Sequence, residues 1–105
     1  MAERVSAAEF EQKVLASEIP VLVDFYSDSC IPCKMLSPIL SQLESEYAGK
    51  AGIVKVNVNF DGELAERYEV LAAPTLVLFR DGSEVSRLRG AVGKDQIKEL
   101  IDQVL

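Results

Sequence analysis

The chain has 105 residues, 49% of them hydrophobic, with 17 acidic and 11 basic side chains and a net charge of −6. This length and composition can bury one core, so we expect a single domain over residues 1–105, and the absence of a basic cluster speaks against nucleic acid as a partner. Charges interrupt the first twenty residues and no later run could span a membrane, which predicts a cytoplasmic protein that is not bound to a membrane.

The N-terminal half predicts a helix, a strand and a second helix. Ser6 and Glu9 have the spacing of a capping box, which predicts a first helix over residues 7–17. The continuous apolar run Val21–Tyr26 predicts a central strand that is covered on both faces. The second helix contains Pro38, and we expect this proline and the apolar stripe of the helix to serve packing and shape. That stripe is Met35, Leu36, Ile39, Leu40, Leu43 and Tyr47.

The C-terminal half predicts a strand, a short helix, a hairpin and a last helix. A strand over residues 53–58 is followed by a short helix that Asp61 can cap. Residues 75–79 and 84–88 predict a β-hairpin, and residues 94–105 predict an amphipathic helix. Strands that alternate with helices and close in a hairpin predict an α/β fold. Its central sheet should be mixed and mostly parallel, with helices on both faces.

The most informative segment is Cys30-Ile31-Pro32-Cys33, which holds both cysteines of the chain and follows the predicted central strand. If the helix begins one or two residues earlier, Cys30 lies in its first turn, where free N–H groups and the helix dipole stabilise a thiolate. Cys33 lies one turn further in and should be less exposed. We therefore expect Cys30 to attack a substrate disulfide and Cys33 to resolve the mixed disulfide, while Pro32 stiffens the ring.

Three other roles for the two cysteines compete with redox chemistry. A structural zinc ion needs four ligands, and with no histidine and no third cysteine only a dimer sharing one ion would complete the site. A permanent disulfide across so short a loop removes little chain entropy. A buried, inert pair is disfavoured by the polar segment Ser27-Asp28-Ser29 before the motif and by Lys34 after it. The residues therefore favour a redox site at the surface.

Beyond the cysteine motif, the sequence resembles the thioredoxins along essentially its whole length. The segments that carry the resemblance are Val23-Asp24-Phe25, Cys30-x-Pro32-Cys33-Lys34-Met35, Pro38, Lys55, Ala73-Pro74-Thr75, Phe79-Arg80-Asp81-Gly82 and Gly90. The resemblance implies the thioredoxin fold, with a C-terminal β-hairpin and helix, and reduction of protein disulfides by dithiol–disulfide exchange. It implies no bound cofactor, because the electrons reside on the two sulfurs.

The resemblance also implies partners. These are disulfide-containing proteins as substrates and a thioredoxin reductase or a comparable electron donor, and we expect the chain to be a monomer. An alternative function is a thioredoxin-like binding module that docks a dedicated partner and whose redox activity is secondary. Retention of both thiols favours the oxidoreductase, since docking alone needs neither of them.

Two charged residues in predicted strands acquire roles by resemblance. Asp24 is an acid inside an apolar strand, so burial should raise its pKa. The resemblance implies that Asp24 lies beneath Cys33 and assists its deprotonation through water; the alternative is a carboxylate that only pairs with Lys55. By resemblance Lys55 neighbours Asp24 and belongs to the catalytic group, and its alternative is an edge-strand lysine that points at water.

A second group of residues is expected to bind the substrate. Pro74 matches the family's cis-proline, and the backbone of Ala73 would pair with an extended substrate segment beside Cys30. Gly90, Ala91 and Val92 would complete a shallow apolar rim, although Gly90 also suits a simple turn.

The cysteine segment departs from the thioredoxin pattern at three positions. Thioredoxins usually carry tryptophan where this chain has Tyr26 and Ser29, and glycine where it has Ile31. The loss of an indole removes a flat apolar contact, whereas Ile31 adds a branched side chain between the sulfurs. With Pro32, we assign these three residues to the substrate-binding surface, and we expect the choice of partners to differ from that of the common form.

Overall fold

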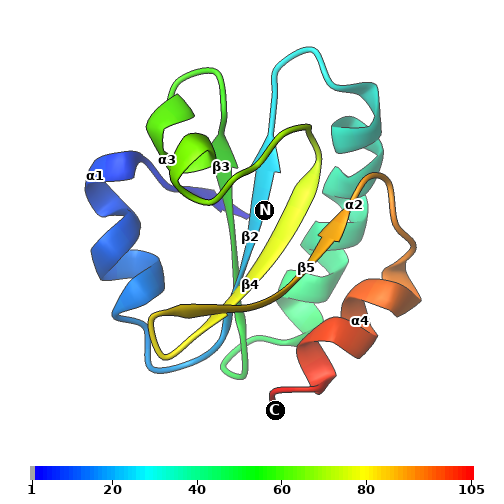
Figure 1. The fold of residues 1–105 in the computed structure, drawn as a ribbon. Helices are drawn as coiled ribbons and strands as arrows, with labels where there is room; N and C mark the ends of the chain where they lie inside the picture. The colour runs from blue at the N-terminus through cyan, green and yellow to red at the C-terminus, as the bar shows by residue number, and fades with distance from the viewer. Residues whose placement is uncertain (1) are drawn as a thin grey trace.

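The computed structural model describes residues 2–105. Its centre is one five-stranded sheet with the strand order β1-β3-β2-β4-β5 (Figure 1). The strands are β1 (Glu3–Arg4), β2 (Val21–Tyr26), β3 (Gly52–Asn57), β4 (Thr75–Arg80) and β5 (Ser83–Arg89). Strands β1 and β2 pair with β3 in parallel, and β4 runs against its neighbours β2 and β5. The predicted mixed sheet is confirmed, because four of the five described strands point in one direction.

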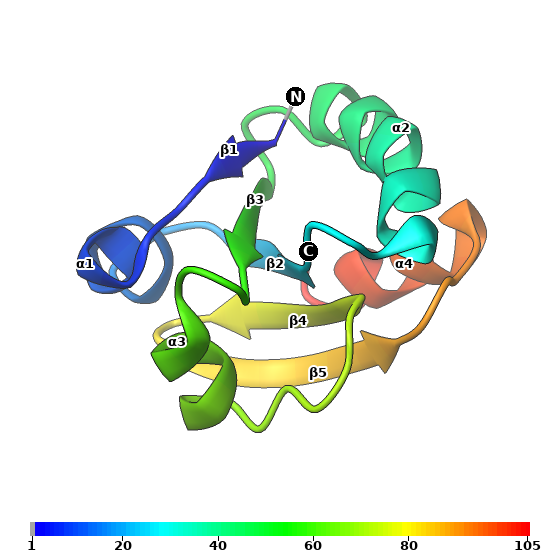
Figure 2. The ribbon, with the colours of Figure 1, turned by 90° about the horizontal axis from the view of Figure 1, so that it is seen from above.

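Helices cover both faces of the sheet. They are α1 (Ala7–Phe10), the π-helical continuation η1 (Glu11–Leu15), α2 (Ile31–Glu46), α3 (Gly62–Arg67) and α4 (Lys94–Asp102). Figure 2 shows α1 and α3 on one side of the sheet and α2 and α4 on the other. Among residues 2–105, no helix has the length and apolar character needed to cross a membrane.

The two faces of β2 belong to two different core clusters. Val21, Val23 and Phe25 pack in the cluster on the side of α1 and α3, whereas Leu22 packs in the cluster on the side of α2 and α4. Successive side chains of a strand point to opposite faces. Asp24 therefore shares the face of Leu22 and is directed toward the layer that contains α2.

The hairpin between β4 and β5 turns on two residues only. Asp81 and Gly82 both have positive φ values, 53° and 81°. This is the pattern of a type I′ turn, whose twist matches that of the flanking strands and which favours an Asp-Gly pair. The predicted hairpin is confirmed, with strands that are longer than expected because Arg80 and Ser83 pair with each other.

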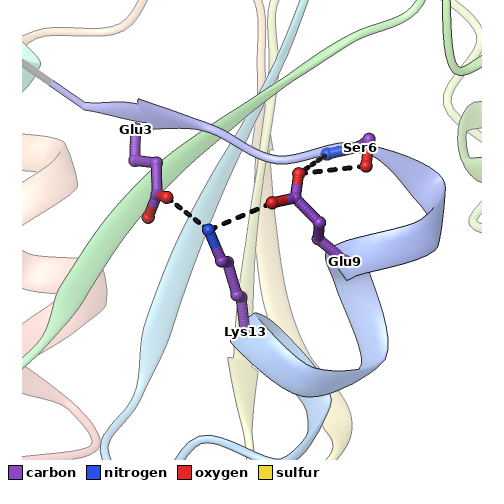
Figure 3. A network of polar contacts seen from close by, with 4 residues as sticks. All are labelled: Glu3, Ser6, Glu9 and Lys13. Atoms are coloured by element: carbon purple, nitrogen blue, oxygen red, sulfur yellow. Dashed lines mark hydrogen bonds and ion pairs between the residues drawn. The ribbon is translucent and has the colours of Figure 1, made fainter.

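A polar network fastens the N-terminal strand to the first helix (Figure 3). Oε1 of Glu9 accepts hydrogen bonds from the backbone N–H of Ser6 at 3.1 Å and from its hydroxyl at 3.0 Å. The Nζ of Lys13 contacts Glu3 and lies 3.1 Å from Glu9. The Ser6 and Glu9 pairing anticipated from the sequence is present, although the helix ends at Leu15 and not at residue 17. The strand β1 was not predicted, because two residues carry no periodic pattern.

Two predictions about individual side chains were wrong, and a third was right in part. Met35 was expected in the core, but it is 65% exposed, because the buried side of α2 follows Leu36, Leu40 and Leu43. Pro38 is exposed as well and does not belong to the packed face. Asp61 is the N-cap residue of α3, as predicted, but its side chain makes no capping hydrogen bond. Its Oδ1 instead accepts a hydrogen bond of 3.1 Å from the backbone N–H of Ala7, which ties α3 to α1.

A hydrogen bond between helices α2 and α4 gives a first testable prediction. The hydroxyl of Tyr47 donates to Oδ1 of Asp102 at 2.6 Å, and burial together with this bond raises the pKa of Tyr47 to about 12. Tyr47→Phe removes the donor while the exposed Asp102 can be hydrated, so we expect the free energy of unfolding to fall by about 1 kcal/mol. Urea titration at neutral pH measures this loss. Between about pH 10 and pH 12 the difference should vanish, because there the unfolded tyrosine ionises first.

Candidate active site

The cysteine motif lies at the start of α2, after the short loop that follows β2. Cys30 is the N-cap residue of α2, with an extended backbone at φ −91° and ψ 106°, and it is joined to Cys33 by a disulfide whose Cα atoms are 5.2 Å apart. Cys30 was expected inside the first turn, but Ile31 and Pro32 occupy the first two helical positions. Proline is well suited there because its missing N–H has no partner in the helix anyway.

The backbone of α2 forms a hydrogen bond with the sulfur of Cys30. The N–H of Cys33 donates to Sγ of Cys30 at 3.0 Å, so one of the free N–H groups of the helix N-terminus points at this atom. Cys30 is 9% exposed and Cys33 is 5% exposed, so Cys33 is the less exposed of the two, as predicted. On either side of Cys30, Ser29 and Ile31 are exposed, so the sulfur lies just below an accessible surface.

Two asparagines that the sequence analysis did not identify, Asn57 and Asn59, hold the loop before Cys30. Asn59 Oδ1 accepts from the backbone N–H of Asp28 at 3.0 Å, and Nδ2 of Asn57 donates to Asp28 Oδ1 at 2.9 Å. Oδ1 of Asn57 in turn accepts from the N–H of Asn59 at 2.8 Å. The C-terminal end of β3 thus anchors the loop that follows β2. Asn57, an asparagine at the end of a predicted apolar strand, was the only signal in the sequence. Its partner Asp28 is 29 residues away, so a local pattern does not reveal the contact.

Asp24 is a buried acid near Cys33. Its side chain is 5% exposed, and its Oδ1 is buried and has no hydrogen-bond partner in the described part of the chain. Burial raises the pKa of Asp24 to about 7, and the positive charge of Lys55 offsets part of this rise. The predicted direction of the shift is therefore confirmed, and its main cause is loss of hydration. A group with such a pKa can exchange a proton at neutral pH.

Lys55 stands opposite Asp24 in the sheet. The two residues are partners in the parallel register of β2 and β3, and β3 lies between β1 and β2. The alternative of an edge-strand lysine pointing at water is therefore wrong. The Nζ of Lys55 lies 5.2 Å from the centre of the Tyr26 ring, a distance at which a cation is attracted to an aromatic face.

A pocket of about 220 Å³ connects these groups. Cys33 lines it and Cys30 does not, so the pocket approaches the motif from the side of Cys33. The lining residues are Asp24, Tyr26, Ser27, Asp28, Cys33, Lys34, Ser37 and Lys55. The structure thus brings together Asp24, Lys55 and Cys33, as the sequence analysis expected.

The other predicted site residues gather at the same edge of the sheet. The Ala73–Pro74 peptide bond is cis, and the register places Thr75 of β4 opposite Phe25 of β2. The N–H of Gly90 donates to the carbonyl of Pro74 at 2.9 Å, and Gly90 has a φ of 84°, which suits glycine in particular.

The expected apolar rim is not uniform in exposure. Ala91 is exposed, whereas Val92 is half-buried and packs against the core cluster on the side of α2. Several large apolar side chains are exposed, among them Ile31 at 70% and Leu71, three residues before Pro74, at 94%. Leu71 was not identified from the sequence, because a single leucine in a loop has no pattern that marks it as exposed.

Comparison with known proteins decides the family. A family model described as Thioredoxin matches residues 1–103. The chain belongs to the thioredoxin family. It is similar to the thioredoxin of Mycobacterium tuberculosis, with 42% identity over 102 residues that cover 96% of this chain and 88% of the relative. It is also similar to Thioredoxin 1 of Synechococcus elongatus, with 38% identity over 105 residues that cover 100% of this chain and 98% of the relative.

Membership of the thioredoxin family agrees with the geometry of the cysteine pair. The protein is a protein-disulfide oxidoreductase that works by dithiol–disulfide exchange. The thioredoxin family implies disulfide-containing substrates and a thioredoxin reductase as partners. The sequence-based interpretation of the fold and of the reaction type is therefore confirmed.

Proposed function

We propose that this thioredoxin reduces protein disulfides with Cys30 as the attacking sulfur and Cys33 as the resolving sulfur. The observation that carries the proposal is the hydrogen bond of 3.0 Å from the N–H of Cys33 to Sγ of Cys30 at the start of α2. In the reduced protein this donor and the helix N-terminus favour the thiolate of Cys30. That thiolate attacks a substrate disulfide and releases one substrate thiolate. Cys33 then attacks Sγ of Cys30 and releases the second.

Asp24 serves as the base for the second step in this proposal. The carboxyl group is buried beside Cys33 in the pocket, and with its pKa near 7 it can accept the proton of the Cys33 thiol. Lys55 faces the carboxyl group across the strand pair and favours its charged form.

The substrate chain is proposed to lie along the backbone of Ala73, a half-buried residue before Pro74. An extended segment there would run beside the open end of β4, next to the cysteine motif. Tyr26, Ser29, Ile31 and Pro32 would contact it on the side of α2. Gly90, Ala91 and Val92 would contact it on the side of β5. Exposure of Ile31 and Leu71 supports a substrate with apolar side chains near its cysteine.

Reduction of insulin by dithiothreitol tests this function. The reduced protein should accelerate precipitation of the insulin chains, and a variant with both cysteines replaced by serine should not. The equilibrium of the Cys30–Cys33 pair with a glutathione buffer, followed by mass, shows whether the pair works as a reductant. No acceleration of insulin reduction, or a pair that stays reduced in mild oxidant, would contradict the proposal.

The departures from the thioredoxin pattern predict slow reduction by a general thioredoxin reductase. Ser29→Trp combined with Ile31→Gly restores the usual aromatic contact and removes the branched side chain, so we expect kcat/KM for a bacterial thioredoxin reductase to rise about fivefold to tenfold. NADPH-coupled kinetics measure this change. Ile19→Gly, an exposed isoleucine before β2, is the matched control. Ordinary turnover of the natural sequence that the double change does not improve would contradict the prediction.

Residues 1–105 are proposed to act as one monomeric domain. A centre that must be re-reduced after every turnover also suits a reducing compartment, and we propose the cytoplasm. Sedimentation of the purified protein in both redox states tests the monomer.

A further inference from the structure

The pocket beside Cys33 is lined by polar groups that lack protein partners. The Oδ1 of Asp24 is such a group, and within residues 2–105 no protein hydrogen bond involves the hydroxyls of Ser27 and Ser37. Liquid water takes up about 30 Å³ per molecule, so a pocket of about 220 Å³ has room for several. Water enters a cavity that is large enough and polar, whereas apolar cavities stay dry. The lining therefore favours a hydrated pocket.

Ser37 is placed between the reacting groups and solvent. It follows Cys33 by four residues on α2, and side chains at this spacing are neighbours on one helix face. Asp24 faces the same pocket from β2, across the interface between sheet and helix. Ser37 is exposed while Asp24 and Cys33 are buried. Ser37 thus lines the pocket and is also accessible to bulk water.

We propose that Ser37 is a positioning residue whose hydroxyl holds the water that links the Asp24 carboxyl group to Cys33 and to solvent. This inference rests on the proposed role of Asp24 as the base. In the resolving step the thiol proton of Cys33 passes through this water to the Asp24 carboxylate. The electron pair on Sγ of Cys33 forms the bond to Sγ of Cys30, and the substrate thiolate leaves with the electrons of the mixed disulfide. The carboxylic acid then releases its proton through the Ser37 water to solvent.

Several charged or titratable groups line the pocket together with Asp24. They are Lys55 from β3, Cys33 and Lys34 from α2, and Tyr26 and Asp28 at the end of β2 and in the loop after it. Only Lys55 has a marked effect on the carboxyl group, and it favours the carboxylate. Ser37 carries no charge, so its replacement tests the water path without changing this balance.

A matched pair of variants tests the inference. Ser37→Val and Ser37→Thr have nearly the same shape and differ in the hydroxyl. The resolving step is followed by stopped flow with Ellman's reagent, in which the second equivalent of thionitrobenzoate leaves when Cys33 attacks. We expect Ser37→Val to slow this phase about fivefold at neutral pH and to raise its solvent deuterium isotope effect, and Ser37→Thr to restore both. Ser45→Val, on α2 but outside the pocket, should leave the phase unchanged.

The Asp24→Asn background separates the two proposals. There the resolving step should be about tenfold slower or more, and adding Ser37→Val should change nothing further, because both residues serve one proton path. A normal rate for Ser37→Val with a slow Asp24→Asn would overturn the role of Ser37 and leave that of Asp24 intact. The same fivefold loss in both backgrounds would mean that Ser37 acts only through packing, which also overturns it. A normal rate for Asp24→Asn would remove the proposed base itself.

Discussion

Cys33→Ser is expected to reduce insulin turnover to the background rate and to trap Cys30 in a covalent mixed disulfide with its substrate. The chain has two cysteines, so once Cys33 is gone no second sulfur can release the substrate from Cys30. Because the N–H of residue 33 remains, the helix N-terminus still favours the Cys30 thiolate and the first attack proceeds. Incubation with a disulfide-containing protein and non-reducing electrophoresis, followed by intact mass, should show the adduct.

The reciprocal variant is the control for the assignment of the two sulfurs. Cys30→Ser should also fail to turn over, but it should form little adduct, because Cys33 is the more buried of the two residues. If instead the adduct accumulates through Cys33 and not through Cys30, the roles are exchanged. Equal adducts in both variants would show that the helix N-terminus does not select the attacking sulfur.

Asp24→Asn is expected to stabilise the disulfide form at about pH 8 by about 2 to 4 kcal/mol. Burial raises the pKa of the folded carboxyl group to about 7, whereas in the unfolded chain it ionises near its ordinary value of 3.8. The unfolded chain therefore loses this proton first. The contribution of the neutral acid to stability is complete below about pH 4 and is lost as the pH rises to about 7. Above that range the folded protein bears the cost of a buried carboxylate.

Denaturant titrations across this pH range measure the difference. The two proteins should have similar free energies of unfolding near pH 4. As the pH rises, the natural protein should become less stable than Asp24→Asn. Asp81→Asn is a suitable control, because this carboxylate is 85% exposed and asparagine is equally suited to the hairpin turn. A constant difference between Asp24→Asn and the natural sequence at every pH would contradict the assigned cause.

A buried acid that weakens the folded state is understandable if it serves the reaction. The cost arises from the same loss of hydration that brings its pKa to neutral pH, and a base is most useful when its pKa lies near the working pH. The stability gained by Asp24→Asn and the slower resolving step should therefore appear in the same variant.

Local patterns were sufficient for the central strand and the cysteine motif. The run Val21–Tyr26 is continuous and apolar, and the structure has the strand with these bounds. The two cysteines are three positions apart, so their disulfide needs no distant part of the chain. The helix start was displaced by two or three residues, because cap geometry depends on the backbone angles of one residue, which a sequence pattern does not specify.

By itself, then, the sequence determined the helices, the strands other than β1 and the position of the two sulfurs, since these depend on neighbours within a few residues. Its resemblance to the thioredoxins along the whole chain indicated the reaction. Only the tertiary structure decided how Asp24, Ser37 and Lys55 meet in one pocket, and that Met35 is exposed. It also decided that Asn57 holds the loop before Cys30. These arrangements depend on strand register and on how α2 packs across β2, which are set by contacts between residues far apart in the chain.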